Sequence, residues 1–406
     1  MAEHAISEIF FEIFVLLSSA VLLGRLAERL YIPRVAGELS AGILWGPTAL
    51  GSEAFEFFHL SLDRHSEAWL LIYWLSLTLM MLTAGIHVAN RTGKTRFKIL
   101  GLLIVGSTLI PFVVGLLVAN WFQDSSGTTV LVFSGFLGLA ACVTSLPVIS
   151  KIFADLGILD SVFAGNVIRA SAVQEVVVWS LFSILLVLHQ AGSYDLVGAI
   201  PDAIFAGVFI AVSLMIAPIL LRRARKGIAI LFPGNNVVSA VFLFSLGLVL
   251  IGDWLNLDLL ISALISGVLI GKFEGPRIGR ASDSIGFFTL GLFAPLFFAL
   301  VGYQLDLSKF FSMSSFLLFL FVSSVVKISS VNLLLRLGKL QKLQCLDYGF
   351  AMNTRGGPGI VLASIGFSNG IIDEIMFTTL VLVSIATAVI AGVWLGYRRN
   401  MGYVFS

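Results

Sequence analysis

The chain has 406 residues, of which 58% are hydrophobic and only 12% are charged, and its mean hydropathy is +1.02. These values exclude an ordinary soluble domain and predict an all-α polytopic membrane protein, so the lipid bilayer is its first expected partner. The formal net charge of +2 gives no sign of nucleic-acid binding, and no nucleic-acid partner is expected.

Apolar runs of about twenty residues, the length that crosses a bilayer as a helix, predict about 13 transmembrane helices. The second, eighth and ninth runs are the shortest. In chain order the runs lie at residues 7–30, 34–51, 67–89, 97–122, 129–154, 160–189, 197–223, 237–253, 257–272, 282–303, 310–338, 345–369 and 375–398.

Lysine and arginine gather in alternate connections between these runs, as they do in cytoplasmic loops. Connections after odd-numbered runs hold groups such as Arg222, Arg223 and Arg225, whereas the intervening connections hold only Arg64 and Lys309. This bias predicts a multi-pass protein of the cell (inner or plasma) membrane, with its N-terminus outside and its C-terminus in the cytoplasm. We expect no cleaved signal peptide and no soluble domain, so a regulatory subunit would be a separate chain.

Two of the runs are interrupted near their middles. The fifth contains Thr144-Ser-Leu-Pro147 and the twelfth contains Asn353-Thr-Arg-Gly-Gly-Pro-Gly359. Proline removes a helical donor and glycine relaxes the backbone, so Pro147 in the fifth run, and Gly356 and Gly357 in the twelfth, predict breaks. With the seventh run as a connector, the breaks fall at the fifth helix of two inverted six-helix repeats. Such paired breaks point to a transporter's substrate site.

A carboxylate, Glu175, lies near the middle of the sixth run, where an acidic residue costs about 2.5 to 3.5 kcal/mol. Ser171 precedes it by one helical turn and shares its face, and Gln174 can reach the same site from the side. Thr144 and Ser145 lie at a similar depth in the fifth run. Together with backbone carbonyls freed at the break, these oxygen atoms can bind a dehydrated monovalent metal cation.

Removal of a carboxylate from water favours its protonated form, so protons and cations would compete for Glu175. A bare carboxylate is costly to move past apolar side chains, whereas the protonated and cation-bound forms are close to neutral. Only these two forms should cross the membrane, which predicts exchange of a cation for a proton. Lys327 and Arg355 would offset the carboxylate and the helix ends at the breaks. Two alternatives remain open: Glu175 as a structural anchor paired with one of these cations, and Thr144 and Ser145 hydroxyls bonded to their own helix.

The stretch Gly37-Glu-Leu-Ser-Ala-Gly-Ile-Leu-Trp-Gly-Pro47, followed by Leu50-Gly51, resembles the second-helix signature of the second subgroup of the monovalent cation:proton antiporter superfamily. This subgroup includes sodium/proton and potassium-efflux antiporters. Further similar stretches occur in the same order, namely Leu82-Thr-Ala-Gly-Ile86, Thr144-Ser-x-Pro147, the polar pair at 174 and 175, Pro295-Leu-Phe-Phe298 with Gly302, Lys327, and Arg355-Gly356.

The resemblance implies crossed, broken helices in a mobile core, elevator-type alternating access and a homodimer. It implies scaffold and dimerisation helices at 1–92 and 233–305, core helices at 93–192 and 306–406, and a connecting helix at 193–232. Carried over by position, Glu175 binds the ion, Thr144 and Ser145 lie at the first crossing, Lys327 faces the acidic pair, and Arg355 lies at the second crossing with Asn353 and Thr354.

The chain departs from the family pattern at its acidic pair. Sodium/proton antiporters of this type usually have Asp-Asp or Asn-Asp, whereas this chain has Gln174-Glu175. A Gln-acid pair is more similar to the potassium-efflux branch, which usually has aspartate. The sequence therefore does not choose between sodium and potassium.

We interpret the chain as a secondary antiporter that exchanges a monovalent cation for protons, with a role in pH homeostasis. Because one acid of the pair can titrate, we expect electroneutral exchange. A gated cation channel or sensor is an alternative, and so is a sodium-coupled organic-anion symporter with an anion site near Arg355 or Arg169. No nucleophile–base pair or metal triad occurs in the runs, so we expect neither an enzyme nor a cofactor.

Overall fold

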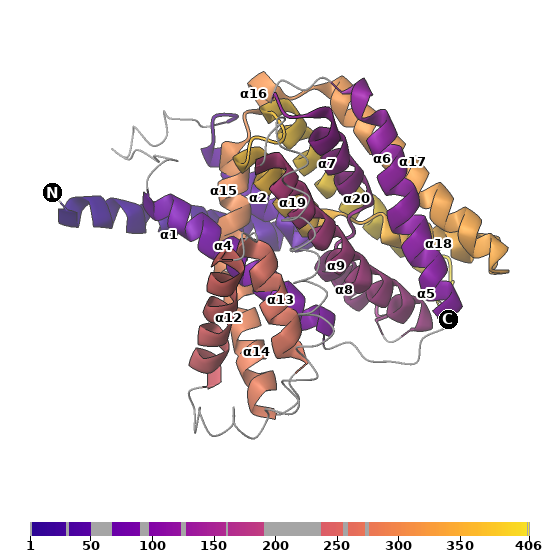
Figure 1. Ribbon diagram of the computed structural model, residues 1–406, viewed down its shortest axis with the longest axis horizontal. Coiled ribbons are helices and arrows are strands. Elements are labelled where there is room, and N and C mark those ends of the chain that lie inside the picture. Colours follow the sequence, from indigo (N-terminus) through magenta and orange to yellow (C-terminus); the bar gives the residue numbers. More distant parts are fainter. Residues whose placement is uncertain are drawn as a thin grey trace.

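A computed structural model describes residues 2–29, 32–49, 67–89, 97–122, 127–159, 161–190, 237–254, 259–272, 276–403 and 405. These residues form helices and their connections, with no strand among them (Figure 1). The predicted seventh run at 197–223 and the basic group at Arg222, Arg223 and Arg225 lie outside them.

Helices occupy the other predicted runs. The first part of the chain contains α1 (Ala2–Arg29), α2 (Arg34–Trp45), α4 (Glu67–Ala89), α5 (Phe97–Ile104), the π-helical turn η1 (Val105–Leu109), α6 (Ile110–Val118), η2 (Ala119–Trp121), α7 (Val130–Cys142), α8 (Leu146–Asp155) and α9 (Val162–Gln190). The second part contains α12 (Val237–Trp254), α13 (Leu259–Gly271), α14 (Pro276–Phe288), the π-helical turn η3 (Thr289–Phe293), α15 (Ala294–Gln304), α16 (Leu307–Phe310), α17 (Met313–Leu337), α18 (Lys342–Met352), α19 (Gly356–Ser368) and α20 (Glu374–Asn400).

Seven helical segments in the described part of the chain are long and apolar enough to cross a membrane. They lie at Ser7–Arg29, Glu67–Ile86, Lys98–Trp121, Val162–His189, Ile278–Gln304, Met313–Leu337 and Glu374–Asn400. Shorter apolar helices include α7 and α19, each of which is one half of an interrupted run. The protein is therefore a multi-pass, all-helical membrane protein, and the total of thirteen spans stays a prediction.

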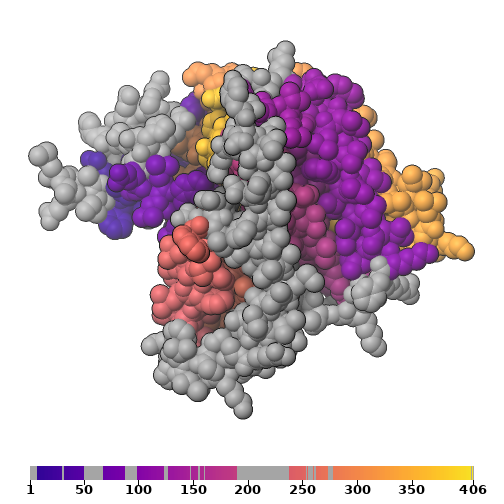
Figure 2. All heavy atoms as spheres, viewed as in Figure 1, coloured from indigo at the N-terminus to yellow at the C-terminus, as the bar shows by residue number. Residues whose placement is uncertain are grey.

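The helices form two groups in Figure 1. One group contains α5 to α9 and α17 to α20, and the other contains α4 and α12 to α15 with α1 and α2. The outer flank of the first group is formed by residues 97–122 and α17, which lie side by side (Figure 2). Leu117 and Phe321 on this flank are about 70% exposed (70% and 69%), as expected for side chains that face lipid. The predicted division into core and scaffold helices stays a prediction.

Two close helix pairs in the second group depend on glycine. A Cβ atom on Gly42 of α2 would lie 1.8 Å from the carbonyl oxygen of Ala299 in α15, and one on Gly267 of α13 would lie 2.1 Å from that of Leu82 in α4. Gly302 and Gly85 face these glycines from the partner helices. Small residues let membrane helices pack backbone to backbone, so these positions set the spacing of α2 with α15 and of α4 with α13.

Helix ends that the charge bias predicts on one side of the membrane lie together. Thr128 donates a hydrogen bond to the carbonyl of Gly370 (2.9 Å), and His189 Nε2 lies 2.8 Å from the carbonyl oxygen of Asn369. At the opposite ends of the helices, Lys151 forms an ion pair with Glu28 (3.0 Å). These contacts join helix ends that the charge bias assigns to the same side, and the orientation of the two termini stays a prediction.

Candidate functional site

The two interrupted runs cross each other at their breaks. Between α7 and α8 the backbone unwinds at residues 143–145, and between α18 and α19 it unwinds at residues 353–355. The amide of Ser145 donates to the carbonyl of Thr354 (2.6 Å), and the Thr144 hydroxyl donates to the carbonyl of Met352 (2.6 Å). Gly356 follows the second break at φ +50°, a backbone conformation that favours glycine. The two breaks therefore satisfy part of each other's backbone.

Arg355 supplies donors to the end of α7. Its Nε donates to the carbonyl of Ala140 (3.1 Å) and its Nη2 to that of Ala141 (3.0 Å), while Nη1 donates to Asn353 Oδ1 (3.0 Å). The side chain is 1% exposed. The last carbonyls of a helix have no intrahelical donor and carry negative partial charge, so a buried cation stabilises them.

Lys327 of α17 completes the same set of bonds. Its Nζ lies 2.5 Å from the carbonyl oxygen of Cys142, 2.8 Å from that of Val143 and 2.8 Å from Thr144 Oγ1. An ammonium group has three N–H donors and no acceptor, so each of its protons has an oxygen partner. Lys327 and Arg355 therefore compensate the end of α7.

The side chain of Glu175, a residue of α9, reaches the start of α8 and is 2% exposed. Its Oε1 accepts a hydrogen bond from the amide of Leu146 (3.1 Å), where the positive end of the helix dipole favours an anion. Its Oε2 has no hydrogen-bond partner among the residues that the structure describes. None of the ion pairs among the described side chains includes Glu175, so it is not an anchor paired with Lys327 or Arg355.

Some of the side chains predicted around Glu175 have oxygen atoms that already form hydrogen bonds, and others have oxygen atoms that are available to a ligand. The Ser145 hydroxyl accepts from the amide of Val148 (3.3 Å) and so caps the start of its own helix, α8. The Thr144 hydroxyl bonds the carbonyl of Met352 and Nζ of Lys327, so it holds the crossing together. Gln174 Oε1 is buried without a partner. Among the described residues, the Ser171 hydroxyl bonds only the sulfur of Met352 (3.8 Å), and a thioether is a weak acceptor. Gln174, Ser171 and Glu175 therefore offer oxygen atoms to a ligand.

The second break contributes two further open atoms. Asn353 Nδ2 and Thr354 Oγ1 are buried, and neither has a hydrogen-bond partner in the described part of the chain. Gly357 lies under the ring of Phe298, where a Cβ atom would be 3.3 Å from Cζ. Pro147 lies in the first turn of α8, and its side chain is outside the described set.

A family model for the sodium/hydrogen exchanger, transmembrane, matches residues 15–397. The chain belongs to this family. The match confirms the resemblance to the monovalent cation:proton antiporter superfamily, which was based on short motifs spread over most of the sequence.

Relatives within the superfamily agree with this assignment. Cation/H(+) antiporter 17 of Arabidopsis thaliana is 28% identical over 403 residues, which are 95% of this chain and 47% of that protein. Na(+)/H(+) antiporter NhaS4 of Synechocystis sp. is 25% identical over 393 residues, 93% of this chain and 94% of that protein. The solved structure of the sodium proton antiporter MjNhaP1 of Methanocaldococcus jannaschii has a similar fold, with a TM-score of 0.67 at 17% identity and 98% coverage of both chains. The chain spans about half the length of several curated relatives it matches.

Sequence reasoning missed one part of the site in this family member, the π-helical turn η1. Gln174 Nε2 donates to the carbonyl of Ser107 (2.9 Å) and also to that of Cys142, so Gln174 joins η1 to the first break. The Ser107 and Thr108 hydroxyls are buried there without partners. The available signal was Pro111, which has no N–H to donate to the carbonyl four residues earlier, that of Ser107.

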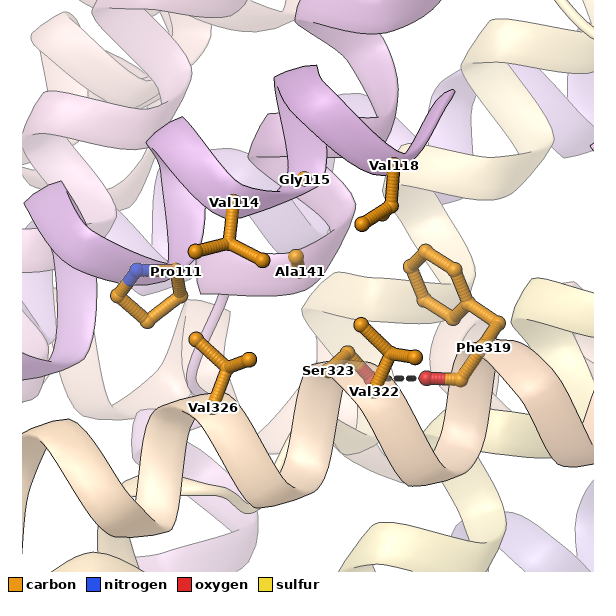
Figure 3. A pocket seen from close by; sticks show the side chains of 9 residues that line it. All are labelled: Pro111, Val114, Gly115, Val118, Ala141, Phe319, Val322, Ser323 and Val326. Carbon is orange, nitrogen blue, oxygen red and sulfur yellow. Dashed lines mark hydrogen bonds between the residues drawn. The ribbon is translucent and has the colours of Figure 1, made fainter. Parts of the chain in front are cut away.

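A small cavity beside the crossing is not the ion site of this exchanger-family chain. Its volume of about 10 Å³ is near the minimum for one water molecule. The only hydroxyl in its lining belongs to Ser323, and it already donates to the carbonyl of Phe319 (2.5 Å). Figure 3 shows the lining side chains, which are Pro111, Val114, Gly115, Val118, Ala141, Phe319, Val322, Ser323 and Val326.

Proposed function

We propose that the chain exchanges a monovalent cation for protons across a cell membrane and that both bind Glu175. One observation carries the proposal: within the described part of the chain, this carboxylate is 2% exposed, one of its oxygen atoms has no hydrogen-bond partner, and no basic side chain is paired with it. A bare charge at this depth is costly, so the group needs a proton or a cation. Either a proton or a monovalent cation neutralises the carboxylate. The two therefore compete for Glu175.

The open oxygen atoms beside Glu175 support a cation as the competitor of the proton. Gln174 Oε1 can only accept, and it has no donor. A dehydrated alkali cation needs several such oxygen ligands. The weakly bonded Ser171 hydroxyl adds a third side chain on the same helix. The name of the Synechocystis relative favours sodium as the first cation to test, and that of the Na(+)/H(+)-K(+) antiporter GerN of Bacillus cereus, 24% identical, favours potassium as the second.

The contacts of Lys327 support one-for-one, electroneutral exchange. All three ammonium protons of Lys327 bond oxygen atoms at the first break. If Nζ lost one of these protons, its lone pair would face an oxygen atom that is itself an acceptor. With Lys327 charged throughout the cycle, Glu175 alone gains and loses a proton or a cation. The organic-anion alternative gains no support from Arg355, because each guanidinium nitrogen already bonds an oxygen of the chain.

The movement and assembly are further parts of the proposal. The helix group that contains both breaks would shift against the other group as an elevator once Glu175 is neutral. The group with the glycine-packed pairs would form the scaffold and the homodimer interface. The charge bias supports an outside N-terminus and a cytoplasmic C-terminus.

Purified protein in liposomes, with a pH-sensitive dye inside and an imposed sodium or potassium gradient, tests the exchange. We expect cation-dependent proton flux that is independent of an imposed membrane potential. Glu175→Gln keeps the size of the side chain and an acceptor for Leu146, and it should abolish the flux.

The matched control is Glu38→Gln. Glu38 is 3% exposed but forms an ion pair with Arg34 (2.7 Å), so its substitution should leave exchange intact. Full exchange by folded Glu175→Gln would remove the site assignment. Cation flux without proton counter-flow would favour the channel, and flux that responds to voltage would overturn the electroneutral stoichiometry.

A further inference from the structure

Helices α8 and α19 each begin at a break, and each is followed in the chain by a long helix, α9 or α20. A side chain of that long helix bonds the backbone where the half-helix begins, and it lies at the same position along the long helix in both cases. At the first break, Glu175 Oε1 accepts from the amide of Leu146 (3.1 Å). At the second break, Thr387 Oγ1 accepts from the amide of Arg355 (3.3 Å). Glu175 lies thirteen residues after Val162, the first residue of α9, and Thr387 lies thirteen residues after Glu374, the first residue of α20.

The local packing brings Thr387 to this amide. Gly359 of α19 faces α20, and a Cβ atom there would lie 2.4 Å from Ser384 Oγ, one turn before Thr387. The absence of a side chain at Gly359 lets this part of α20 approach the second break. The Thr387 hydroxyl donates to the carbonyl of Val383 (2.9 Å), so its lone pairs stay free to accept from Arg355.

We infer that Thr387 is the counterpart of Glu175 in the second half of the chain and is a positioning residue for the ion site. It fixes the backbone of Arg355, whose guanidinium bonds the carbonyls of Ala140 and Ala141 at the end of α7. The Thr387 hydroxyl is neutral and does not titrate. The charge at the second break therefore stays constant while Glu175 binds and releases protons and cations. The inference rests on the proposed exchange at Glu175.

The role of Thr387 has a consequence for cation affinity. Without the hydroxyl, the buried amide of Arg355 loses its acceptor, so the backbone that carries the guanidinium can shift and weaken the bonds of the guanidinium to the end of α7. The α7 carbonyls then carry uncompensated negative partial charge next to the site. The site should bind the cation more tightly and release it more slowly.

Thr387→Val removes the hydroxyl and keeps the shape of the side chain. In the liposome assay we expect the KM for the cation to decrease about threefold or more and Vmax to fall. Displacement of the Arg355 guanidinium strengthens cation binding and slows cation release. Thr387→Ser should restore both values. A purely structural loss would lower Vmax with the folded fraction and leave KM unchanged. If Thr387→Val does not yield folded protein, Thr387→Ala removes the same hydroxyl.

Thr379→Val is the matched control. It makes the same change in α20, at a buried hydroxyl that has no hydrogen-bond partner, so KM and Vmax should stay at the wild-type values. An unchanged KM in folded Thr387→Val, or an equal decrease in Thr379→Val, would overturn the inference. Absence of cation-dependent proton flux in the wild-type chain would instead contradict the proposed function.

Discussion

The crossing of the broken helices and the glycine-packed helix pairs are two ways to bring backbones close together inside a membrane. At the crossing, irregular backbone has lost its own helical partners, and Arg355, Lys327 and Thr144 replace them with side-chain donors. At Gly42 and Gly302 the helices remain regular, and only the absence of a Cβ atom is needed. Backbone polar groups in a bilayer must be satisfied internally, so only the first arrangement requires buried charge.

The comparison separates two kinds of defect. A change at the crossing should leave polar groups without partners and should alter transport in the protein that still folds. A change at a glycine contact should alter packing and stability, while the folded fraction keeps its affinity for the cation. The next two variants test this separation.

The largest expected effect is that of Lys327→Met. The substitution leaves the carbonyls of Cys142 and Val143 without their donor, and it removes a buried charge that compensates a helix end. Each unsatisfied buried acceptor costs about 1–3 kcal/mol, so we expect a loss of roughly 3–5 kcal/mol in the free energy of unfolding, and no exchange. Thermal unfolding in detergent measures the first and the liposome assay the second.

Lys309→Met is the control for this variant. The Lys309 side chain is 72% exposed, so its loss should change stability by less than about 0.5 kcal/mol. An unfolding temperature of Lys327→Met equal to that of Lys309→Met would show that the α7 carbonyls do not depend on the lysine.

Gly302→Ala should have the next largest effect. A Cβ atom there would lie 2.1 Å from the carbonyl oxygen of Leu39 in α2, so one of the two backbones must move. Overpacking of this kind costs about 1–3 kcal/mol. Gly291→Ala is the matched control in the same long helical segment, because no atom lies within 4 Å of its Cβ position. We expect a lower unfolding temperature for Gly302→Ala alone, with the KM for the cation unchanged; a changed KM would contradict the separation.

The helical breaks and the buried acid were predictable from the sequence for local reasons. Gly356 and Pro147 interrupt helices through their own backbone chemistry, whatever packs around them. Glu175 is conspicuous because a charge in an apolar run is costly. These features need no knowledge of which helices are neighbours.

Partners far apart in the sequence could not be predicted in the same way. The sequence indicated that Lys327 and Arg355 compensate charge, but not that they bond the carbonyls of residues 140–143. The buried ion pair of Asp347 with Arg398 (3.0 Å) was also missed, because each residue lies near the end of a run and resembles an ordinary loop charge. The chain has 39 glycines, and nothing local distinguishes Gly42 and Gly302 as a contact.

The smallest expected effect concerns the corner between α15 and α16, outside the membrane-spanning segments. The Ser308 hydroxyl donates to Asp306 (2.5 Å), and Lys309 adds its amide (3.2 Å) and its ammonium (3.2 Å), so these bonds hold the pKa of the Asp306 carboxyl below its ordinary range. A lowered pKa in the folded state gives stability that is present above the ordinary pKa of aspartate and is lost as the pH falls through the folded value.

Asp306→Asn should therefore be slightly less stable than the wild-type chain at neutral pH and equally stable at strongly acidic pH. Unfolding temperatures of both proteins, measured over the acid range, check this convergence. The corner should remain folded in both, because Thr48 at the end of α2 donates to the carbonyl of Leu305 (2.6 Å) and accepts from the amide of Leu307 (3.0 Å). These two bonds contain no titratable group, so a gap between the two proteins that is constant with pH would mean that Asp306 acts by packing and not through its charge.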